Sequence, residues 1–264
     1  MMIKFGIVEW CLDRRGIDSI YRASGLGLSS IQLEVPGRER LLALSSPAVQ
    51  RAYLQAAKDT GVEITGLGLN VVLRFGGMTE NAGTPGQTKC LDIIKRGVDI
   101  AAAMGLDLLY MPAFAEAEMQ TAADIANTAG LYRQACRAAE GSELLIGTEN
   151  TLGVADNLQL FALVDHPKLR LMIDTFNPVL WGHPTSGLIK NLSHLMCRQV
   201  HVKDGVNGVM GNAPLDAGQG KFSDAAQALR SIKFTGHLLL ENEYEQDVDA
   251  GVARDIAVLK QYFN

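Results

Sequence analysis

Three carboxylates and one histidine stand at the ends of four strand-like segments in the second half of this chain. The segments cover residues 143–149, 169–174, 198–201 and 237–241. Each has a polar or basic residue at its first or second position, continues through apolar residues, and ends at Glu149, Asp174, His201 or Glu241. A short continuous apolar run is typical of a strand that is buried on both faces of a parallel sheet. The C-terminal ends of such strands meet at one edge, so these four side chains are predicted to bind one divalent cation.

The spacing of the four residues supports this interpretation. They are 25, 27 and 40 positions apart (174−149, 201−174 and 241−201), which fits successive strand–helix units with one long loop. His201 also lies between Val200 and Val202, in a core-like context. A buried histidine needs a partner for its ring nitrogens, and a metal ion is one such partner.

Strand and helix patterns alternate along the rest of the chain. The other expected strands cover 4–9, 30–35, 63–72 and 106–111. The expected helices cover 17–25, 46–59, 87–104, 122–139, 155–164, 186–195, 223–231 and 249–262. Regular alternation implies a parallel sheet with right-handed crossovers. Eight strand–helix units in 264 residues predict a (β/α)8 TIM barrel that forms a single domain over 1–264, because such barrels take roughly 250 residues.

Composition narrows the classes of function. The formal net charge is −5, whereas a nucleic-acid surface requires a basic stripe. The four cysteines form no CxxC pair, so we expect neither a structural metal site nor disulfides. The chain starts with MMIKFGIVEW, which is typical of a strand rather than a signal peptide. No apolar stretch is long enough for a membrane span. We therefore predict a cytoplasmic protein with no nucleic-acid or membrane partner.

Barrel geometry also predicts where a substrate binds, because the loops after every strand share one mouth. The strand ends and loops on that side contribute Trp10, Glu34, Asn70, Trp181, His183 and Lys203. Lys203 lies two residues after His201, so on a strand their side chains would be on the same face. The Lys203 side chain is therefore expected to point into the barrel, as that of His201 does. Asp204 is expected to be a turn or helix-cap residue. The glycine-rich stretch 205–220 is expected to be a loop, either a mobile lid or a flexible connection.

Four short segments resemble a known group of barrels. They are Thr-Glu-Asn at 148–150, Ile-Asp-Thr-Phe-Asn at 173–177, Val-His-Val-Lys-Asp at 200–204 and Leu-Glu-Asn at 240–242. On these segments the chain resembles the xylose isomerase-like superfamily of sugar isomerases and epimerases. Residues 214–220 also resemble the Pro-Leu-Gly-x-Gly turn of that superfamily, with two residues inserted.

The resemblance implies an activity and a role for each residue. It implies one divalent ion (Mn²⁺, Mg²⁺, Co²⁺ or Zn²⁺) on the four strand-end residues, with Glu149 and Glu241 as the acid–base pair. The reaction would be isomerisation or epimerisation of a small sugar, keto-sugar or sugar phosphate through a metal-stabilised enediolate. Asn177 stands where ketose 3-epimerases carry histidine, and its amide is expected to bind a substrate oxygen.

Three alternatives remain open from the sequence. The same metal site could serve a lyase that dehydrates a keto-polyol, or a barrel that binds a sugar without turnover. An endonuclease IV-like nuclease is disfavoured, because its zinc cluster requires more histidines than the five present here, at least three of which look misplaced. The expected partner is a small-molecule sugar, and the sequence leaves a homo-oligomer open.

Overall fold

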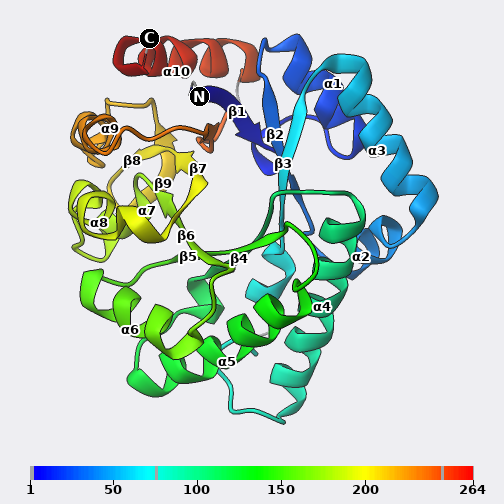
Figure 1. Cartoon of the computed structure of the whole chain (residues 1–264). Coiled ribbons are helices and arrows are strands. Elements are labelled where there is room, and N and C mark those ends of the chain that lie inside the picture. The colour runs from blue at the N-terminus through cyan, green and yellow to red at the C-terminus, as the bar shows by residue number, and fades with distance from the viewer. Residues whose placement is uncertain (1–2, 75–76, 245–246, 264) are drawn as a thin grey trace. The chain divides into compact units, whose positions relative to one another are not determined.

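The computed structural model describes residues 3–74, 77–244 and 247–263. Parallel strands and helices alternate along these residues, and Figure 1 traces the alternation by colour from blue to red. The main sheet has the strand order β1-β10-β7-β6-β5-β4-β3-β2 and closes on itself. The predicted (β/α)8 barrel is therefore confirmed.

The element bounds agree with the predicted segments to within a few residues, apart from the differences described below. The strands of the closed sheet are β1 (Lys4–Val8), β2 (Ser30–Glu34), β3 (Glu63–Gly68), β4 (Leu108–Ala113), β5 (Leu145–Asn150), β6 (Leu169–Asp174), β7 (Met196–Val202) and β10 (His237–Leu240). The α-helices are α1 (Ile17–Gly25), α2 (Arg38–Leu44), α3 (Pro47–Thr60), α4 (Pro85–Ala103), α5 (Ala122–Ala138), α6 (Val154–Val164), α7 (Asn177–Leu180), α8 (Thr185–Leu192), α9 (Phe222–Ser231) and α10 (Val248–Phe263).

The chain groups into two compact units. The first contains residues 1–32, 55–64 and 172–264, and the second contains residues 33–54 and 65–171. The boundaries between the units fall within β2, α3, β3 and β6. That residues 1–264 form a single domain stays a prediction.

In the first unit, β1 pairs with β2 and with β10, and β10 pairs with β7, all in parallel. Leu238, Leu239 and Leu240 of β10 are all fully buried. This is the burial on both faces that the continuous apolar run predicts. The pairing places Leu239 opposite His201 and Leu240 opposite Val202, so the ends of β7 and β10 lie level with each other.

In the second unit, β4 pairs with β3 and with β5, again in parallel. Its long helices start at well-formed caps. The Thr84 side chain accepts the Gln87 N–H ahead of α4, and Thr121 and Asp124 form a capping box at the start of α5. Side-chain acceptors of this kind satisfy N–H groups that have no partner inside a helix.

One expectation about the first half of the chain was wrong, and one helix was not predicted. The third strand ends at Gly68 rather than at residue 72, and a 3-10 helix, η2, covers Asn70–Arg74. The apolar pair Val71 and Val72 extends the strand-like pattern, but both residues are buried in that helical turn. Helix α2 was not predicted, because its seven residues form too short a segment for a clear helical period.

The expectation of an irregular loop over 205–220 was also wrong in part. Strands β8 (Asp204–Val206) and β9 (Val209–Ala213) form an antiparallel hairpin there. Asn207 and Gly208 connect them with φ values of 57° and 76°. Positive φ at both central residues is the geometry of a type I′ turn, for which Asn-Gly is the preferred sequence.

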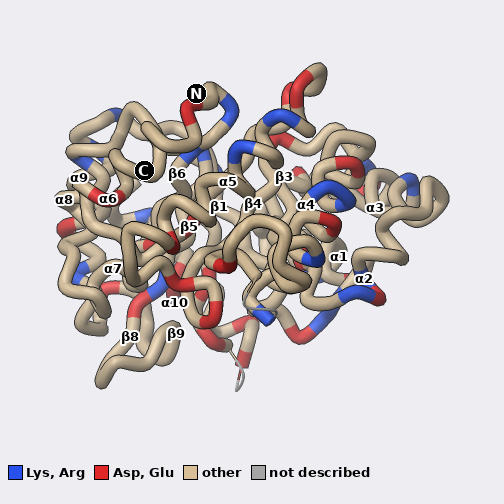
Figure 2. The backbone as a smooth tube through the Cα atoms, turned by 90° about the horizontal axis from the view of Figure 1, so that it is seen from below, with Lys and Arg blue, Asp and Glu red and all other residues tan. Residues whose placement is uncertain are grey.

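Charge is distributed along both units. Figure 2 shows basic and acidic positions interspersed along the described chain. Among the described residues, no helix is both long enough and apolar enough to span a membrane.

Candidate metal site

Hydrogen bonds at the ends of β6, β7 and β10 bring three of the four predicted ligands together. The Thr175 N–H, one residue beyond Asp174, donates to the His201 carbonyl at 3.0 Å. The Glu241 N–H donates to the Val202 carbonyl at 3.0 Å. Asp174 is the last residue of β6, His201 is the last but one of β7, and Glu241 directly follows β10, so all three lie at the same end of neighbouring strands.

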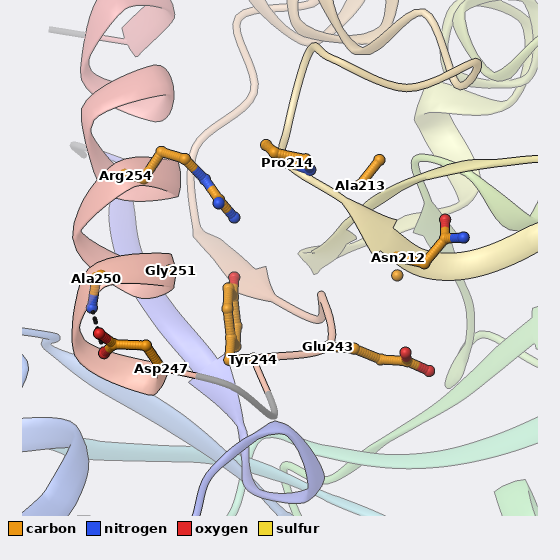
Figure 3. Close-up of a pocket in the computed structure, with 10 residues that line it drawn as sticks. Asn212, Ala213, Pro214, Glu243, Tyr244, Asp247, Ala250, Gly251 and Arg254 are labelled. Carbon is orange, nitrogen blue, oxygen red and sulfur yellow. Dashed lines mark hydrogen bonds between the residues drawn. The ribbon is translucent and has the colours of Figure 1, made fainter.

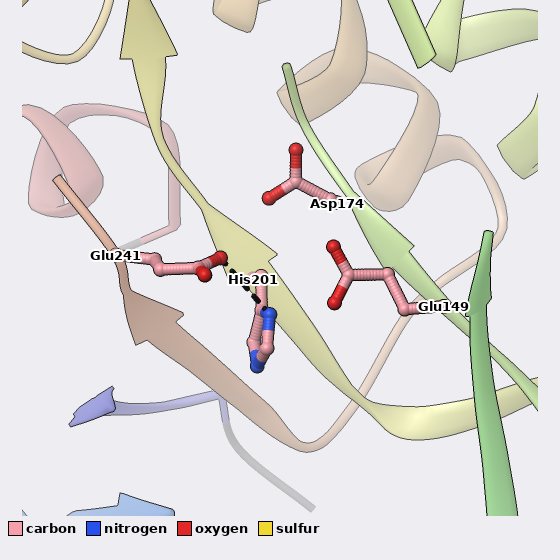
Figure 4. A group of neighbouring side chains, drawn as sticks. All are labelled: Glu149, Asp174, His201 and Glu241. Carbon is pink, nitrogen blue, oxygen red and sulfur yellow. Dashed lines mark ion pairs between the residues drawn. The ribbon is translucent and has the colours of Figure 1, made fainter. Parts of the chain in front are cut away.

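The side chains of these residues converge as well. Asp174, His201 and Glu241 each offer a ligand atom within 4.8 Å of the others. Two atoms that bind one divalent ion at about 2.0–2.6 Å can be up to about 4.0–5.2 Å apart, so a separation within 4.8 Å is of the size that one ion requires. Glu149, the fourth predicted ligand, lies at the end of β5 in the second unit and is drawn with the other three in Figure 4. The donor set of three carboxylates and one imidazole fits a divalent metal.

Backbone groups orient the Asp174 carboxylate. Its Oδ1 atom accepts the N–H of Phe176 at 2.8 Å and also the N–H of Asn177. Short-range bonds of this kind are favoured by aspartate at the start of a turn. The other oxygen, Oδ2, lies 3.4 Å from the Lys203 ammonium nitrogen. One oxygen therefore holds the carboxylate in place while the other faces the site.

Lys203 and His201 both lie against the Glu241 carboxylate. The Glu241 Oε2 atom lies 3.0 Å from Lys203 Nζ and 3.0 Å from His201 Nδ1. Burial, the largest single influence, would raise the pKa of Glu241, but the groups beside its carboxylate, with the Lys203 ammonium first among them, hold that pKa well below its usual range. Lys203 is only 5% exposed, so it points inward, as its shared parity with His201 predicts. These neighbours favour the ionised form of the Glu241 carboxylate, which is the form that binds a cation.

Trp10 contacts two of the ligand candidates. Its indole N–H donates to Glu241 Oε1 at 3.0 Å, and its ring meets the His201 ring edge-on at a centroid distance of 5.7 Å. Arg15 holds the short helix η1 (Glu9–Cys11), which carries Trp10, by donating to the carbonyls of Trp10 and Leu12 at 3.0 and 2.7 Å. Trp10 therefore helps to orient the site itself.

The other predicted substrate residues occupy different places. In the second unit, the Asn70 amide donates to Glu34 Oε1 at 2.9 Å. Asn177 is buried at the start of α7, and Trp181 is 38% exposed at the end of that helix. His183 lines a cavity of about 170 Å³ beside the start of α8. Their roles in substrate binding stay predictions.

A larger cavity lies next to the hairpin. It has a volume of about 430 Å³ and is lined by residues of β9, the stretch after β10 and α10. Figure 3 shows Arg254 reaching from α10 toward the space between Pro214 and Tyr244. None of the four ligand candidates lines this cavity, so it is a feature separate from the metal site.

Asp204 organises the segment that follows β7. This fully buried carboxylate accepts the N–H groups of Gly205, Gly218 and Gly220 at 2.8, 3.0 and 2.8 Å. A Cβ atom on Gly218 would lie 2.2 Å from Asp204 Oδ1, which is why only glycine fits there. Asp204 is thus the turn residue that was expected, and its buried carboxylate holds the two ends of the segment 204–220 together.

We expect Asp204→Ala to lower the free energy of unfolding by about 3 kcal/mol, because it leaves buried N–H groups without an acceptor. Asp204→Asn keeps one acceptor oxygen and should cost less. Urea denaturation measures both values. Asp224→Ala, which removes an exposed carboxylate from α9, is the control and should change stability by less than about 0.5 kcal/mol. Equal stabilities for Asp204→Ala and the control would contradict the anchoring role.

Two buried glutamines near the site were not predicted. Gln32 Oε1 lies 2.9 Å from His201 Nε2, and the Gln32 amide donates to Gln199 Oε1 at 3.1 Å. Polar residues at alternate positions of β2 and β7, with Gln32 between Ser30 and Glu34 and Gln199 two residues before His201, were a signal that could have revealed them. An apolar strand carries such residues on one face only where they have polar partners.

Comparison with known proteins agrees with this fold and site. The family model of the xylose isomerase-like TIM barrel matches residues 20–262. A 2-epi-5-epi-valiolone 7-phosphate 2-epimerase from an Actinoplanes species is 30% identical over 257 residues, covering 97% of this chain and 93% of that protein. The chain belongs to the xylose isomerase-like TIM barrel family.

Two solved structures share the fold at low sequence identity. One is a 3-keto-D-glucoside 4-epimerase from E. coli, with 15% identity, a TM-score of 0.77 and coverage of 98% of this chain and 99% of that chain. The other is a probable 3-DHS dehydratase from Bacillus anthracis, with 16% identity, a TM-score of 0.75 and coverage of 97% and 98%.

Proposed function

We propose that this protein is a divalent-metal-dependent epimerase that inverts a carbon next to the carbonyl of a keto-sugar or a similar ring ketone. The observation that carries the proposal is the convergence of Asp174, His201 and Glu241 within 4.8 Å of one another. Its relative of 30% identity is named as an epimerase of a valiolone phosphate, which favours epimerisation over the broader isomerase prediction. A phosphorylated substrate is therefore included in the proposal.

Glu149, Asp174, His201 and Glu241 would hold the metal. When bound, a divalent ion supplies Lewis-acid stabilisation of the negative charge that develops on substrate oxygens. The Asp174 carboxylate is held by backbone N–H groups, and the His201 ring is fully buried. These two residues would serve mainly as ligands.

Glu241 and Glu149 would move the protons. Epimerisation requires one group to remove a proton from the carbon beside the carbonyl and another to return a proton from the opposite face. Glu241 would carry one of these protons, since its carboxylate is held in a fixed position: Oε1 accepts the Trp10 indole N–H, and Oε2 faces Lys203. Glu149, which is almost fully buried at the end of β5, would act on the other face.

Lys203 would assist by stabilising negative charge on the substrate. Its ammonium lies between the Asp174 and Glu241 carboxylates at 3.4 and 3.0 Å. A cation bound to the same carboxylates would weaken these ion pairs, and Lys203 could then donate a hydrogen bond to a substrate oxygen. Charge-assisted hydrogen bonds of this kind are stronger than neutral ones.

The test is to incubate the protein and Mn²⁺ in D₂O with a panel of ketoses, keto-polyols and 2-epi-5-epi-valiolone 7-phosphate. Epimerisation incorporates deuterium at carbon and leaves the formula otherwise unchanged. A dehydratase would give a product lighter by one water, which mass spectrometry separates from an epimer. The absence of both deuterium exchange and product across the panel would count against the proposal.

Glu34 is expected to bind substrate hydroxyls, because a carboxylate can accept two hydrogen bonds from a polyol. Glu34→Ala should therefore mainly raise KM when the contact is equal in the ground and transition states, and should lower kcat when it is stronger in the transition state. Steady-state kinetics distinguish the two. Glu39→Ala, which removes an acidic residue of the first turn of α2, is the control. Unchanged KM and kcat in Glu34→Ala would show that Glu34 does not bind the substrate.

A further inference from the structure

His201 is held at both of its ring nitrogens. Nδ1 lies 3.0 Å from Glu241 Oε2, on the side of the metal ligands. Nε2 lies 2.9 Å from Gln32 Oε1. His201 and Gln32 are fully buried, and Gln199 is 3% exposed. The contact between His201 and Gln32 is therefore shielded from water.

The two glutamines determine which atom of the Gln32 amide faces His201. Gln32 Nε2 donates to Gln199 Oε1 at 3.1 Å, so the Gln32 amide oxygen faces His201. An amide oxygen only accepts hydrogen bonds, so the ring nitrogen opposite it must carry the proton. A neutral imidazole with its proton on Nε2 has a lone pair on Nδ1. That lone pair points to the side where Glu241 lies.

We propose that Gln32 is a positioning residue for the metal site. By accepting the Nε2 proton, and with its own amide oriented by Gln199, Gln32 selects the His201 tautomer that presents Nδ1 as a ligand. This inference rests on the proposed function in one respect, namely that His201 binds a metal. The contact itself belongs to the protein with or without the ion.

Removing the acceptor should weaken metal binding. In Gln32→Met, a side chain of similar length leaves the buried Nε2 proton without an acceptor. The ring then favours a proton on Nδ1, where it donates to Glu241 and competes with the cation. Loss of a partner behind a metal-binding histidine typically weakens affinity by about 10–100-fold. Gln32→Glu keeps an acceptor and should retain most of the affinity.

The first measurement is a titration of the metal-free protein with Zn²⁺ against a competing chelator. We expect a rise in Kd of about 10–100-fold for Gln32→Met and a much smaller change for Gln32→Glu. The matched control is Gln50→Met, since Gln50 is also a buried glutamine with an amide hydrogen bond, to the Leu44 carbonyl at 2.8 Å. Wild-type Kd in Gln32→Met would overturn the inference.

The second measurement is the NMR signal of the His201 Nε2 proton, assigned by its loss in His201→Gln. It should move upfield or broaden through exchange in Gln32→Met, and move downfield in Gln32→Glu, where the acceptor is stronger. If Gln32→Met does not fold, the shift in Gln32→Glu still decides the question. A signal that does not respond to the Gln32 substitutions would overturn the inference.

Recording this signal in both the metal-free and the Zn²⁺-loaded protein separates the two proposals. Wild-type protein that binds no Zn²⁺ counts against the proposed metal-dependent function. If the chemical shift of the His201 Nε2 proton in the metal-free protein is the same in the Gln32 variants as in the wild type, only the positioning role is contradicted. If Gln32 had only a structural role, its substitution would lower stability. It would not change the shift of the Nε2 proton, and Gln32→Met and Gln32→Glu would not differ in Zn²⁺ affinity.

Discussion

Glu241→Gln is expected to lower turnover by about 10²–10⁴-fold while the fold survives, because it removes a group that accepts and returns a proton. The substitution preserves the size of the side chain and keeps an oxygen for the Trp10 indole. It removes the negative charge that pairs with Lys203 at 3.0 Å, and weaker metal binding should add to the loss. Glu149→Gln is expected to lower turnover over the same range, since both faces of the substrate require a proton carrier.

The matched control is Glu243→Gln. Glu243 lies two residues beyond Glu241 and lines the separate cavity beside the hairpin. The Glu243→Gln substitution therefore removes one negative charge from the same segment without changing a ligand candidate. Its kcat should stay close to wild type. Activity near wild type in Glu241→Gln or Glu149→Gln, measured at saturating substrate with Mn²⁺, would show that the acid–base assignment is wrong for that residue.

Removing the metal should abolish turnover. Dialysis against a chelator is expected to reduce activity to background, and Mn²⁺ should restore it, because the remaining residues cannot supply the Lewis-acid stabilisation of the developing charge. Rebinding should also stabilise the fold, by about 2.7 kcal/mol when the free ion reaches 100 times its Kd. Thermal unfolding with and without Mn²⁺ measures this effect independently of activity.

Asp174→Asn provides the matching variant for the metal experiment. It keeps an oxygen for the Phe176 N–H but loses the negative charge near Lys203. We expect little stabilisation by Mn²⁺ in Asp174→Asn and full stabilisation in Asp224→Asn, a change at an exposed position of α9. Full activity after exhaustive chelation, with no thermal response to Mn²⁺, would contradict metal dependence.

The sequence by itself determined the fold class and the ends of the strands that carry the ligand candidates. Continuous apolar runs are typical of strands that are buried on both faces of a parallel sheet, and β6 (Leu169–Asp174) covers the predicted segment in full. Parallel strands end at a shared edge, so residue type at the last position was enough to select Asp174, His201 and Glu241. Local physics also determined caps, such as the Thr121–Asp124 capping box.

Only the tertiary structure decided the contacts between segments far apart in the chain. Gln32 and His201 are 169 residues apart, and Trp10 and Glu241 are 231 residues apart. No local pattern predicts which donor meets which acceptor over such distances, because the pairing depends on strand register and side-chain direction together. The same holds for Asp204, which reaches three N–H groups only once the chain has turned back at Gly218 and Gly220. Residue types at strand ends thus indicate a metal site, and the packing of distant strands decides how each ligand is oriented.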